Sequence, residues 1–391
     1  MDRQGQCVSG NDARARVLLL GPALDAVSGV STHLRQLLQS DLARDFDIRH
    51  FQVGSEGRRE HGLARAVRLF ASPWALGRQL ARFKPQVVHI NTSLDHKAFW
   101  RDALYLLVAK AMGTRVVCQV HGGAALRFAA GLGVFRFTFK WLLRLPDALV
   151  ILSEAERAAY RALGLGRETR LVPNAIHLDA YGPMAHGAKP GAPMRLVYAG
   201  RLADDKGVFE AVEAMGLLRA WGFGADPILL LAGSGPAERQ LRAKVRAMGL
   251  EDRVTFVGPL QGPALVRFWQ EADLFVFPTF HQEGLPYAVL ESLAAGTPVI
   301  TTRTGGIPDV VQEGVHGLFV APQDPHALAG AIARLVRDPE RLRAMARNCI
   351  ARAHAHYGVA RMTGQMREIY GELLRRADAR VRKRKAPDPS G

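Results

Sequence analysis

The stretch that most constrains the fold is FVFPTFHQEGLPYAVLESLAAGTPVIT, residues 275–301. The apolar run Ala272–Phe277 leads into it and is typical of a strand buried on both faces in a parallel sheet. A loop follows, and then a predicted helix, Pro286–Ala295, whose proline suits the first helical position and which Gly296 ends. The last four residues open another strand. The order strand, loop, helix, strand predicts an α/β domain with a parallel sheet.

Two acids bracket the start of this helix: Glu283 in the loop and Glu291 on the helix, eight positions apart. The free N–H groups and the dipole of a helix N-terminus attract anions, phosphate above all. The loop leaves the carboxyl end of a strand, where open α/β sheets bind ligands, and Gly284 lets a ligand approach the backbone. With phosphate at the helix end, the two carboxylates would accept hydrogen bonds from sugar or ribose hydroxyls. The alternative is that Glu283 is only a dipole partner and Glu291 only a surface acid.

Length and composition indicate a globular protein of two domains. Single cores seldom grow beyond about 250–300 residues, whereas this chain has 391 residues, 48% of them hydrophobic. Cys7, Cys118 and Cys349 are far apart and show neither a disulfide framework nor metal-ligand spacing. The polar N-terminus lacks the apolar core of a signal peptide, and no run of about 18 apolar residues could span a membrane. We therefore expect a cytoplasmic location.

In the first half, residues 16–21 predict a buried strand, which a helix follows. In the segment that joins this strand to the helix, Gly21 and Gly29 are eight positions apart. That separation is too large for the glycine spacing of an NAD-binding loop. A later strand, Thr114–Val120, ends in His121 and two glycines. A histidine at the carboxyl end of such a strand faces the ligand crevice, although a purely structural histidine fits the same pattern.

The second half begins a new strand and helix series at Arg195–Gly200. Arg201 and Lys206 follow, at the strand end and at the mouth of the next helix. Two cations there suit a diphosphate, because arginine binds it through paired hydrogen bonds and lysine as a point charge. The alternative is a local salt-bridge cluster with Asp204 and Asp205.

EGLPYAVLE, residues 283–291, resembles the E-x7-E motif of the retaining glycosyltransferases of family 4. GRLADDKG at 200–207 resembles the GR-x-x-x-x-KG motif of that family, and QVHGG at 119–123 resembles its histidine segment. The resemblance is tightest over residues 195–322 and looser over residues 16–175. It implies an α/β fold of the GT-B type, in which two facing Rossmann-like, doubly wound domains enclose a cleft.

The resemblance also implies a role for each matching residue. Glu283 and His121 would contact the transferred sugar, Arg201 and Lys206 would bind the donor diphosphate, and Glu291 would hold the ribose hydroxyls. The further donor-binding residues are Gly29 before the first helix, Val257 in the strand 254–260 whose end should meet the base, and Gly284 and Leu285 in the loop. We expect no metal or other cofactor, because the two cations can take the place of a divalent ion.

These patterns divide the chain into five parts. They are an N-terminal, acceptor-side Rossmann-like domain at 14–175, a linker rich in Pro and Gly at 176–194, a nucleotide-sugar-binding Rossmann-like domain at 195–355, a helix at 356–376 that crosses back to the first domain, and a disordered basic tail at 377–391.

The formal net charge of +16 suggests an anionic partner. Leu63, Val67, Phe70 and Trp74 are interleaved with arginines at near-helical spacing. Residues 135–144 repeat the pattern. Its cations are Arg136, Lys140 and Arg144, and the apolar residues on the neighbouring face are Phe135, Phe139 and Leu142. Such helices are typical of membrane surfaces, and core helices with a solvated cationic face are the alternative.

Together these features predict a hexosyltransferase that moves a sugar, with retention, from a UDP- or GDP-linked donor to a lipid-linked glycan acceptor. The setting would be bacterial cell-surface polysaccharide synthesis, at the inner face of the membrane. Two other classes stay open. One is a sugar-nucleotide epimerase of the same fold. The other is a basic nucleic-acid-binding protein, but the sequence shows no recognised binding module, so we expect no nucleic acid partner.

Overall fold

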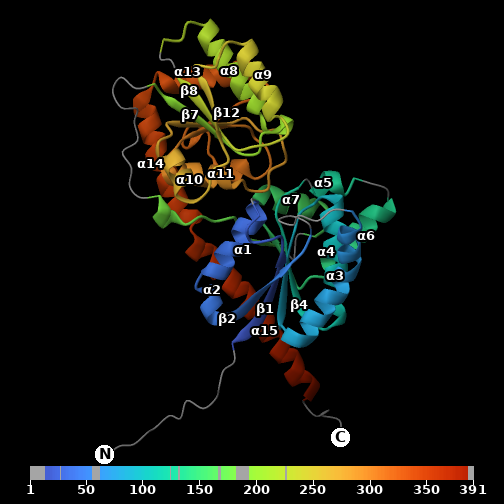
Figure 1. Ribbon diagram of the computed structural model, residues 1–391. Helices are drawn as coiled ribbons and strands as arrows, with labels where there is room; N and C mark the ends of the chain where they lie inside the picture. Colours follow the sequence, from blue (N-terminus) through green and yellow to red (C-terminus); the bar gives the residue numbers. More distant parts are fainter. Residues whose placement is uncertain are drawn as a thin grey trace, which may run out of the picture.

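The computed structural model shows two α/β domains, one above the other in Figure 1. It describes residues 14–26, 28–54, 62–123, 125–130, 133–165, 169–181, 193–224 and 227–385. The side chains of residues 64–66, 126–127 and 377–385 lie outside this description.

The first domain is built on a parallel sheet of six strands in the order β2-β1-β3-β4-β5-β6. The strands are β1 (Ala15–Gly21), β2 (Phe46–Gln52), β3 (Val87–Thr92), β4 (Arg115–Val120), β5 (Ala148–Ile151) and β6 (Thr169–Leu171). The helices are α1 (Gly29–Gln39), α2 (Leu42–Asp45), α3 (Gly62–Phe83), α4 (His96–Ala111), α5 (Ala125–Phe128), α6 (Gly133–Arg144) and α7 (Glu154–Ala162). Because β1 lies between β2 and β3, the strand order reverses there, which opens a crevice at its carboxyl end.

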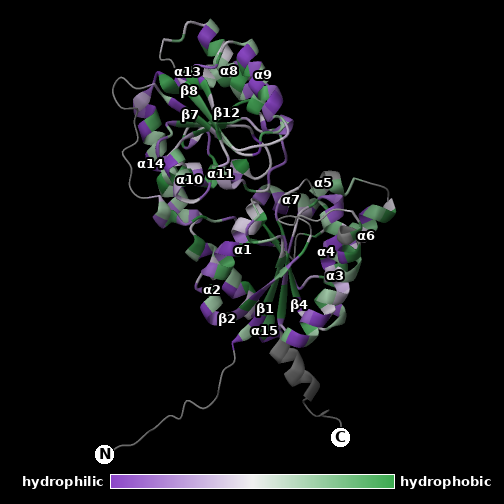
Figure 2. Ribbon diagram, viewed as in Figure 1, coloured by the Kyte–Doolittle hydropathy of each residue, from purple (hydrophilic) through white to green (hydrophobic). Residues whose placement is uncertain are grey.

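Alternate residues of each strand face opposite helical layers, as the pleat requires. Val17 and Leu19 of β1 pack in the core that includes Leu34 of α1. Leu18 and Leu20 pack with α3 and α4 on the other face. Both faces of β1 are therefore apolar, and Figure 2 shows the strands of both domains as the most hydrophobic part of the fold.

The second domain repeats this plan with the order β12-β11-β10-β7-β8-β9, again all parallel. Its strands are β7 (Arg195–Ala199), β8 (Ile228–Ala232), β9 (Val254–Gly258), β10 (Leu274–Phe277), β11 (Val299–Thr301) and β12 (Gly317–Phe319). Its helices are α8 (Val208–Ala220), α9 (Glu238–Ala247), α10 (Gly262–Gln270), α11 (Tyr287–Ala295), α12 (Ile307–Val310), α13 (Pro325–Val336) and α14 (Pro339–His356). Two doubly wound sheets confirm the α/β fold that the sequence predicts.

The last helix, α15 (Val359–Lys385), crosses back to the first domain, as Figure 1 shows. Met362, Met366 and Tyr370 are buried in the core beneath β1, and the Tyr370 hydroxyl lies 2.7 Å from His89 Nδ1. The helix continues past residue 376, so the prediction of a disordered tail is wrong for residues 377–385. That segment consists mostly of Ala, Arg and Lys, which are strong helix formers. The rest of the predicted tail, 386–391, lies outside the described residues.

Two smaller expectations also change. Pro286 precedes the first helical residue of α11, because its ψ of 128° is extended. In α6, Phe139 and Leu142 are buried in the core and Phe135 is packed against it. For these three residues the alternative of a core helix with a solvated cationic face therefore holds, and the expectation of a membrane-facing side is wrong.

Of the predicted linker, residues 182–192 lie outside the described part, and the preceding residues form the short 3-10 turn Leu178–Ala180. The described residues include no helix long and apolar enough to cross a bilayer. Cys118 and Cys349 are buried free thiols, whereas Cys7 is outside the description.

Candidate active site

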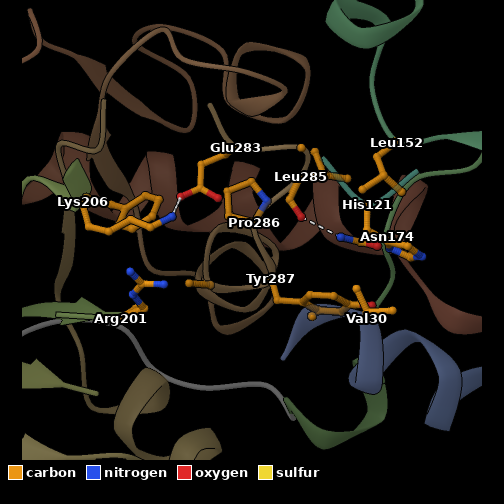
Figure 3. A pocket seen from close by; sticks show the side chains of 15 residues that line it. Val30, His121, Leu152, Asn174, Arg201, Lys206, Glu283, Leu285, Pro286 and Tyr287 are labelled. Carbon is orange, nitrogen blue, oxygen red and sulfur yellow. Dashed lines mark hydrogen bonds and ion pairs between the residues drawn. The ribbon is translucent and has the colours of Figure 1, made fainter. Parts of the chain in front are cut away.

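A cavity of about 320 Å³ lies where residues of both domains meet, and Figure 3 shows its side chains. Seven residues expected to bind the donor line it: Gly29, His121, Arg201, Lys206, Glu283, Gly284 and Leu285. Val257 and Glu291 are not among the lining residues. Val257 is 39% exposed near the end of β9, and Glu291 sits farther along α11.

The strand order explains why residues far apart in sequence converge here. Strand β7 has β8 on one side and β10 on the other, so the order reverses between β7 and β10. The loop after β7 carries Arg201 and Lys206, and the loop after β10 carries Glu283. Neighbouring loops at such a reversal form the ligand crevice of a doubly wound sheet. Across the cavity, His121 follows β4 and Gly29 begins α1.

Lys206 and Glu283 form an ion pair between Nζ and Oε1, and each side chain is only 15% exposed. Figure 3 shows this pair on one side of the cavity, with Arg201 beside it. Arg201 has no carboxylate partner among the residues that the structure describes, so its guanidinium is available to a ligand. The cavity is thus lined by two cations and one carboxylate, and a diphosphate that enters it would compete with Glu283 for Lys206.

The pairing of Lys206 with Glu283 differs from the alternative in which Lys206 would form a local salt-bridge cluster with Asp204 and Asp205. The Asp205 carboxylate instead contacts His281, with Oδ2 2.6 Å from Nδ1. Burial raises the pKa of Asp205, but the hydrogen bond to His281 and the charges of His281 and Lys206 outweigh it, and the net pKa is lowered. Asp205 therefore holds His281 in place and leaves Lys206 to Glu283.

The N-terminus of α11 points its first turn into the cavity, since Pro286, Tyr287 and Ala288 all line it. Pro286 has no side chain that could cap the helix. The first N–H groups of this nine-residue helix are therefore open to an anion, as the sequence predicts.

His121 is held as a neutral ring by its surroundings. Asn91 Nδ2 donates to Leu20 O over 3.1 Å, which turns Asn91 Oδ1 toward His121 Nε2 at 2.8 Å. Because that oxygen can only accept, Nε2 carries the proton and Nδ1 is left as an acceptor. Burial lowers the pKa of His121 well below its usual value, and the nearby His33 and His89 lower it further. A neutral acceptor suits contact with a sugar hydroxyl better than contact with phosphate.

Two residues that sequence reasoning did not single out as site residues tie the loop after β10, which carries Glu283, to the first domain. Asn174 Nδ2 donates to Leu285 O over 2.7 Å, and the Tyr287 hydroxyl donates to Gln36 Oε1 over 3.3 Å. The available signal for Asn174 is its position just after β6, at the carboxyl edge of the sheet. Tyr287 carries no such signal, because its partner lies 251 positions away.

Close packing also explains the glycines around Glu283. A Cβ at Gly284 would lie 2.7 Å from Gly122 Cα of the first domain. Gly305 has φ +56°, and a Cβ there would lie 1.8 Å from Glu283 O. The Gly-rich loop 304–306 therefore supports the backbone that presents Glu283.

We expect Gly305→Ala to displace Glu283. The positive φ alone should cost about 1 kcal/mol, and the clash about 1–3 kcal/mol more. Donor affinity should fall by about tenfold or more. Gly314→Ala is the matched control, because Gly314 also has positive φ but its Cβ would meet no atom nearer than 3.7 Å. Urea unfolding and nucleotide titration of both variants measure the difference, and equal losses would refute the supporting role.

Glu291 is the second acid of the motif, and Trp269 Nε1 donates to its Oε2 over 3.0 Å. Burial raises the pKa of Glu291 to about 7, although the hydrogen bond from Trp269 lowers it. The carboxyl is therefore protonated below neutral pH and ionised above it.

This pKa gives a testable pH dependence. An ionised Glu291 accepts hydroxyl protons better than a protonated one, so affinity for a sugar nucleotide should rise between pH 6 and pH 8, by about tenfold. Sugar nucleotides are suitable ligands because their diphosphate diester does not titrate in this range. In Glu291→Gln the affinity should be lower at pH 8 and independent of pH. A wild-type profile as flat as that of the variant would contradict the assignment.

The sequence matches two families that divide the chain between them. Residues 27–180 match Glycosyltransferase Family 4, and residues 184–352 match Glycosyl transferases group 1. The chain belongs to glycosyltransferase family 4.

Solved structures agree with this assignment at the level of the fold. The family-4 chain is similar to sucrose-phosphate synthase from Thermosynechococcus elongatus, with a TM-score of 0.76 and 22% identity, over 92% of this chain and 99% of that one. It is also similar to Anabaena HepE in complex with UDP-glucose, with a TM-score of 0.72 and 15% identity, over 91% and 99% of the two chains. The GT-B architecture is thereby confirmed.

Among curated relatives, the putative colanic acid biosynthesis glycosyltransferase WcaL of Salmonella typhimurium is 29% identical over 205 residues. The alignment covers 51% of this chain and 50% of WcaL. The chain therefore spans about half the length of that relative.

Proposed function

We propose that this family-4 glycosyltransferase moves a hexose, with retention, from a nucleotide diphosphate sugar to a lipid-linked glycan during bacterial cell-surface polysaccharide synthesis. The observation that carries the proposal is the convergence of Arg201, Lys206 and the open N-terminus of α11 on one cavity, beside the single acid Glu283. A doubly negative diphosphate fits two cations and free N–H groups, and a carboxylate fits the hydroxyls of the attached sugar.

In this reaction the departing diphosphate is the group that needs stabilisation. Arg201, Lys206 and the N–H groups of α11 would offset its charge as the bond to the sugar breaks. When Lys206 turns to the diphosphate, Glu283 is released from its ion pair and can accept a hydrogen bond from the sugar. His121 would offer its bare Nδ1 to another hydroxyl. These contacts orient the anomeric carbon rather than attack it.

Retention through departure and attack on the same face is the better-supported route. A double displacement of the glycosidase kind uses two carboxylates that flank the anomeric carbon. Among the described residues that line the cavity, Glu283 is the single carboxylate. The proposal therefore assigns Glu283 to orientation of the sugar, and the acceptor hydroxyl to the attack.

We further propose that no metal assists the reaction and that Arg201 and Lys206 take the role of a divalent ion. Within the described residues, no three His, Cys, Asp or Glu side chains are grouped as ligands of a metal. Adding EDTA should leave the rate unchanged.

The names of similar proteins support this choice of donor and acceptor. HepE was solved with UDP-glucose, so UDP sugars are the first donors to test and GDP sugars the second. WcaL is named for colanic acid biosynthesis, which favours a growing glycan on a lipid carrier at the cytoplasmic face of the membrane.

The test is to incubate the protein with each sugar nucleotide, with and without a polyprenyl-diphosphate-linked glycan, and to follow the donor and the product by proton NMR. Nucleotide release that requires the acceptor, with the anomeric configuration of the donor kept in the product, supports the proposal. An isomerised donor in the absence of acceptor would instead indicate an epimerase, and inversion would refute retention.

A further inference from the structure

Three neighbouring helices of the first domain expose large apolar side chains to solvent. Each contributes a pair four residues apart, which lies on one side of its helix. We call these six residues the apolar face: Phe70 and Trp74 of α3, Trp100 and Leu104 of α4, and Phe137 and Trp141 of α6. Their side chains are between 40% and 85% exposed. Aromatic residues gathered at this density on a surface mark an interaction site.

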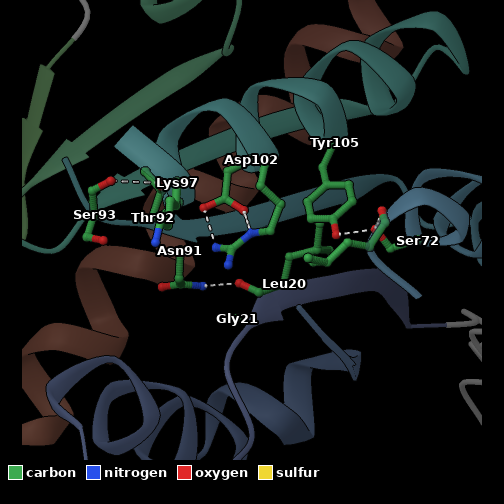
Figure 4. A network of polar contacts seen from close by, with 12 residues as sticks. Leu20, Gly21, Ser72, Asn91, Thr92, Ser93, Lys97, Asp102 and Tyr105 are labelled. Atoms are coloured by element: carbon green, nitrogen blue, oxygen red, sulfur yellow. Dashed lines mark hydrogen bonds and ion pairs between the residues drawn. The ribbon is translucent and has the colours of Figure 1, made fainter. Parts of the chain in front are cut away.

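The apolar face is continuous because α4 contacts both of its neighbours. The Tyr105 hydroxyl of α4 lies 2.8 Å from Ser72 Oγ of α3, as Figure 4 shows. On the other side, the ring of Trp100 lies 5.8 Å from that of Phe135 of α6. In Figure 1 the three helices lie together on one side of the first sheet.

The charge of these helices is almost entirely positive. Their sequences hold one acid, Asp102, and it is buried against Arg101 with Oδ1 2.7 Å from Nε. Exposed cations flank the apolar face on every helix, among them Arg78 of α3, Lys97 of α4 and Arg136 of α6. The surface thus combines apolar and aromatic groups with the exposed cations Arg78, Lys97 and Arg136, while the one acid of these helices is engaged by Arg101.

We infer that the apolar face binds an anionic lipid bilayer and that its aromatic side chains insert at the headgroup boundary. Aromatic side chains with flanking cations match both layers of such a surface: the rings enter the acyl boundary and the cations meet lipid phosphates. Two copies of the chain meeting face to face would oppose like charges. The phosphates of a nucleic acid would pair with the cations, and its bases could stack on the rings. It has no aliphatic group, however, to pack against Leu104 of the middle helix, α4.

The position of the apolar face is compatible with catalysis. None of its six residues lines the cavity. Helix α1, whose Gly29 and Val30 do line it, packs on the opposite side of the sheet. A docked protein therefore keeps the cavity uncovered. The inference does not rest on the proposed transfer reaction, because it requires neither donor nor acceptor.

The test is co-sedimentation of the full chain with vesicles of phosphatidylcholine alone and with 30% phosphatidylglycerol, at low and high salt. The double variant Phe70→Gln, Trp74→Gln removes two inserting rings, and Arg136→Gln, Lys140→Gln removes two cations. Trp221→Gln, Met248→Gln is the matched control, since both residues are exposed apolar side chains of the second domain. Circular dichroism verifies that each variant is folded.

We expect wild type to bind the anionic vesicles and to dissociate as salt rises. The ring variant should bind about 100-fold more weakly or worse, because it loses two inserted rings and each contributes about a factor of ten or more. The cation variant should bind more weakly at low salt and depend less on salt, and the control should match wild type. The inference is overturned if wild type does not bind anionic vesicles at low salt, or if the control variant loses as much vesicle affinity as the ring variant. Light scattering would also overturn the inference if it shows that wild type is a dimer and that the ring variant is a monomer. So would salt-dependent binding of wild type to RNA without binding to vesicles.

Discussion

Replacing Glu283 with glutamine should lower the rate of sugar transfer by about 10²–10³-fold while donor nucleotide binding stays the same or becomes tighter. The two effects have one structural cause. Glu283 forms an ion pair with Lys206, so it would compete with the diphosphate for that lysine, and its replacement would free the lysine. The same change removes the carboxylate that would orient the sugar. Tighter nucleotide binding together with slower sugar transfer would indicate that Glu283 is needed for the transfer step and not for binding of the diphosphate.

Glu271→Gln is the control for this experiment. Glu271 pairs with Arg195 in the same domain, but its side chain is 55% exposed and lies away from the cavity. Its transfer rate and nucleotide affinity should match wild type. A Glu283→Gln protein with a wild-type transfer rate would remove Glu283 from the mechanism.

Replacing Lys206 with methionine should weaken binding of the nucleoside diphosphate by about 10–100-fold, because a buried charged contact to phosphate is lost. Affinity for the nucleoside without phosphates should not change. The variant also leaves Glu283 buried without its cation, which should destabilise the fold by about 1–3 kcal/mol. The double variant Lys206→Met, Glu283→Gln should recover much of that stability, since it removes both charges.

Lys244→Met is the matched control for Lys206→Met, because Lys244 forms an ion pair with Glu213 on the surface of the same domain. It should leave nucleotide affinity and stability close to wild type, as surface pairs contribute little. If Lys206→Met weakens the binding of the nucleoside diphosphate and of the nucleoside by the same factor, the assignment of Lys206 to the diphosphate is wrong.

Much of the fold was predictable because buried parallel strands have a recognisable local sequence pattern. Short apolar runs with loops at their carboxyl ends located β1, β7 and β10, and the residues that follow them became candidates. Arg201, Lys206 and Glu283 were found in this way, and all three line one cavity. The helix that crosses back was predicted as well, but its continuation to Lys385 was not.

The pairing of side chains was not predictable, because it depends on which strands are neighbours. Lys206 has two acids beside it in sequence, yet it pairs with Glu283, 77 positions away, since β7 lies next to β10. The bond from Tyr287 to Gln36 depends on how the two domains meet. In α6, periodicity alone could not decide which apolar side faces the core, and Phe139 proved to be buried while Phe137 is exposed.

Calorimetric titration with UDP and GDP, on wild type and on Glu291→Ala, tests the central claim most directly. We predict that one nucleotide binds wild type at one site per chain, and that Glu291→Ala binds it about 10–100-fold more weakly because a charged contact to the ribose is lost. If neither nucleotide binds wild type, or if Glu291→Ala binds as tightly as wild type, the donor site assigned to this cavity and helix is wrong.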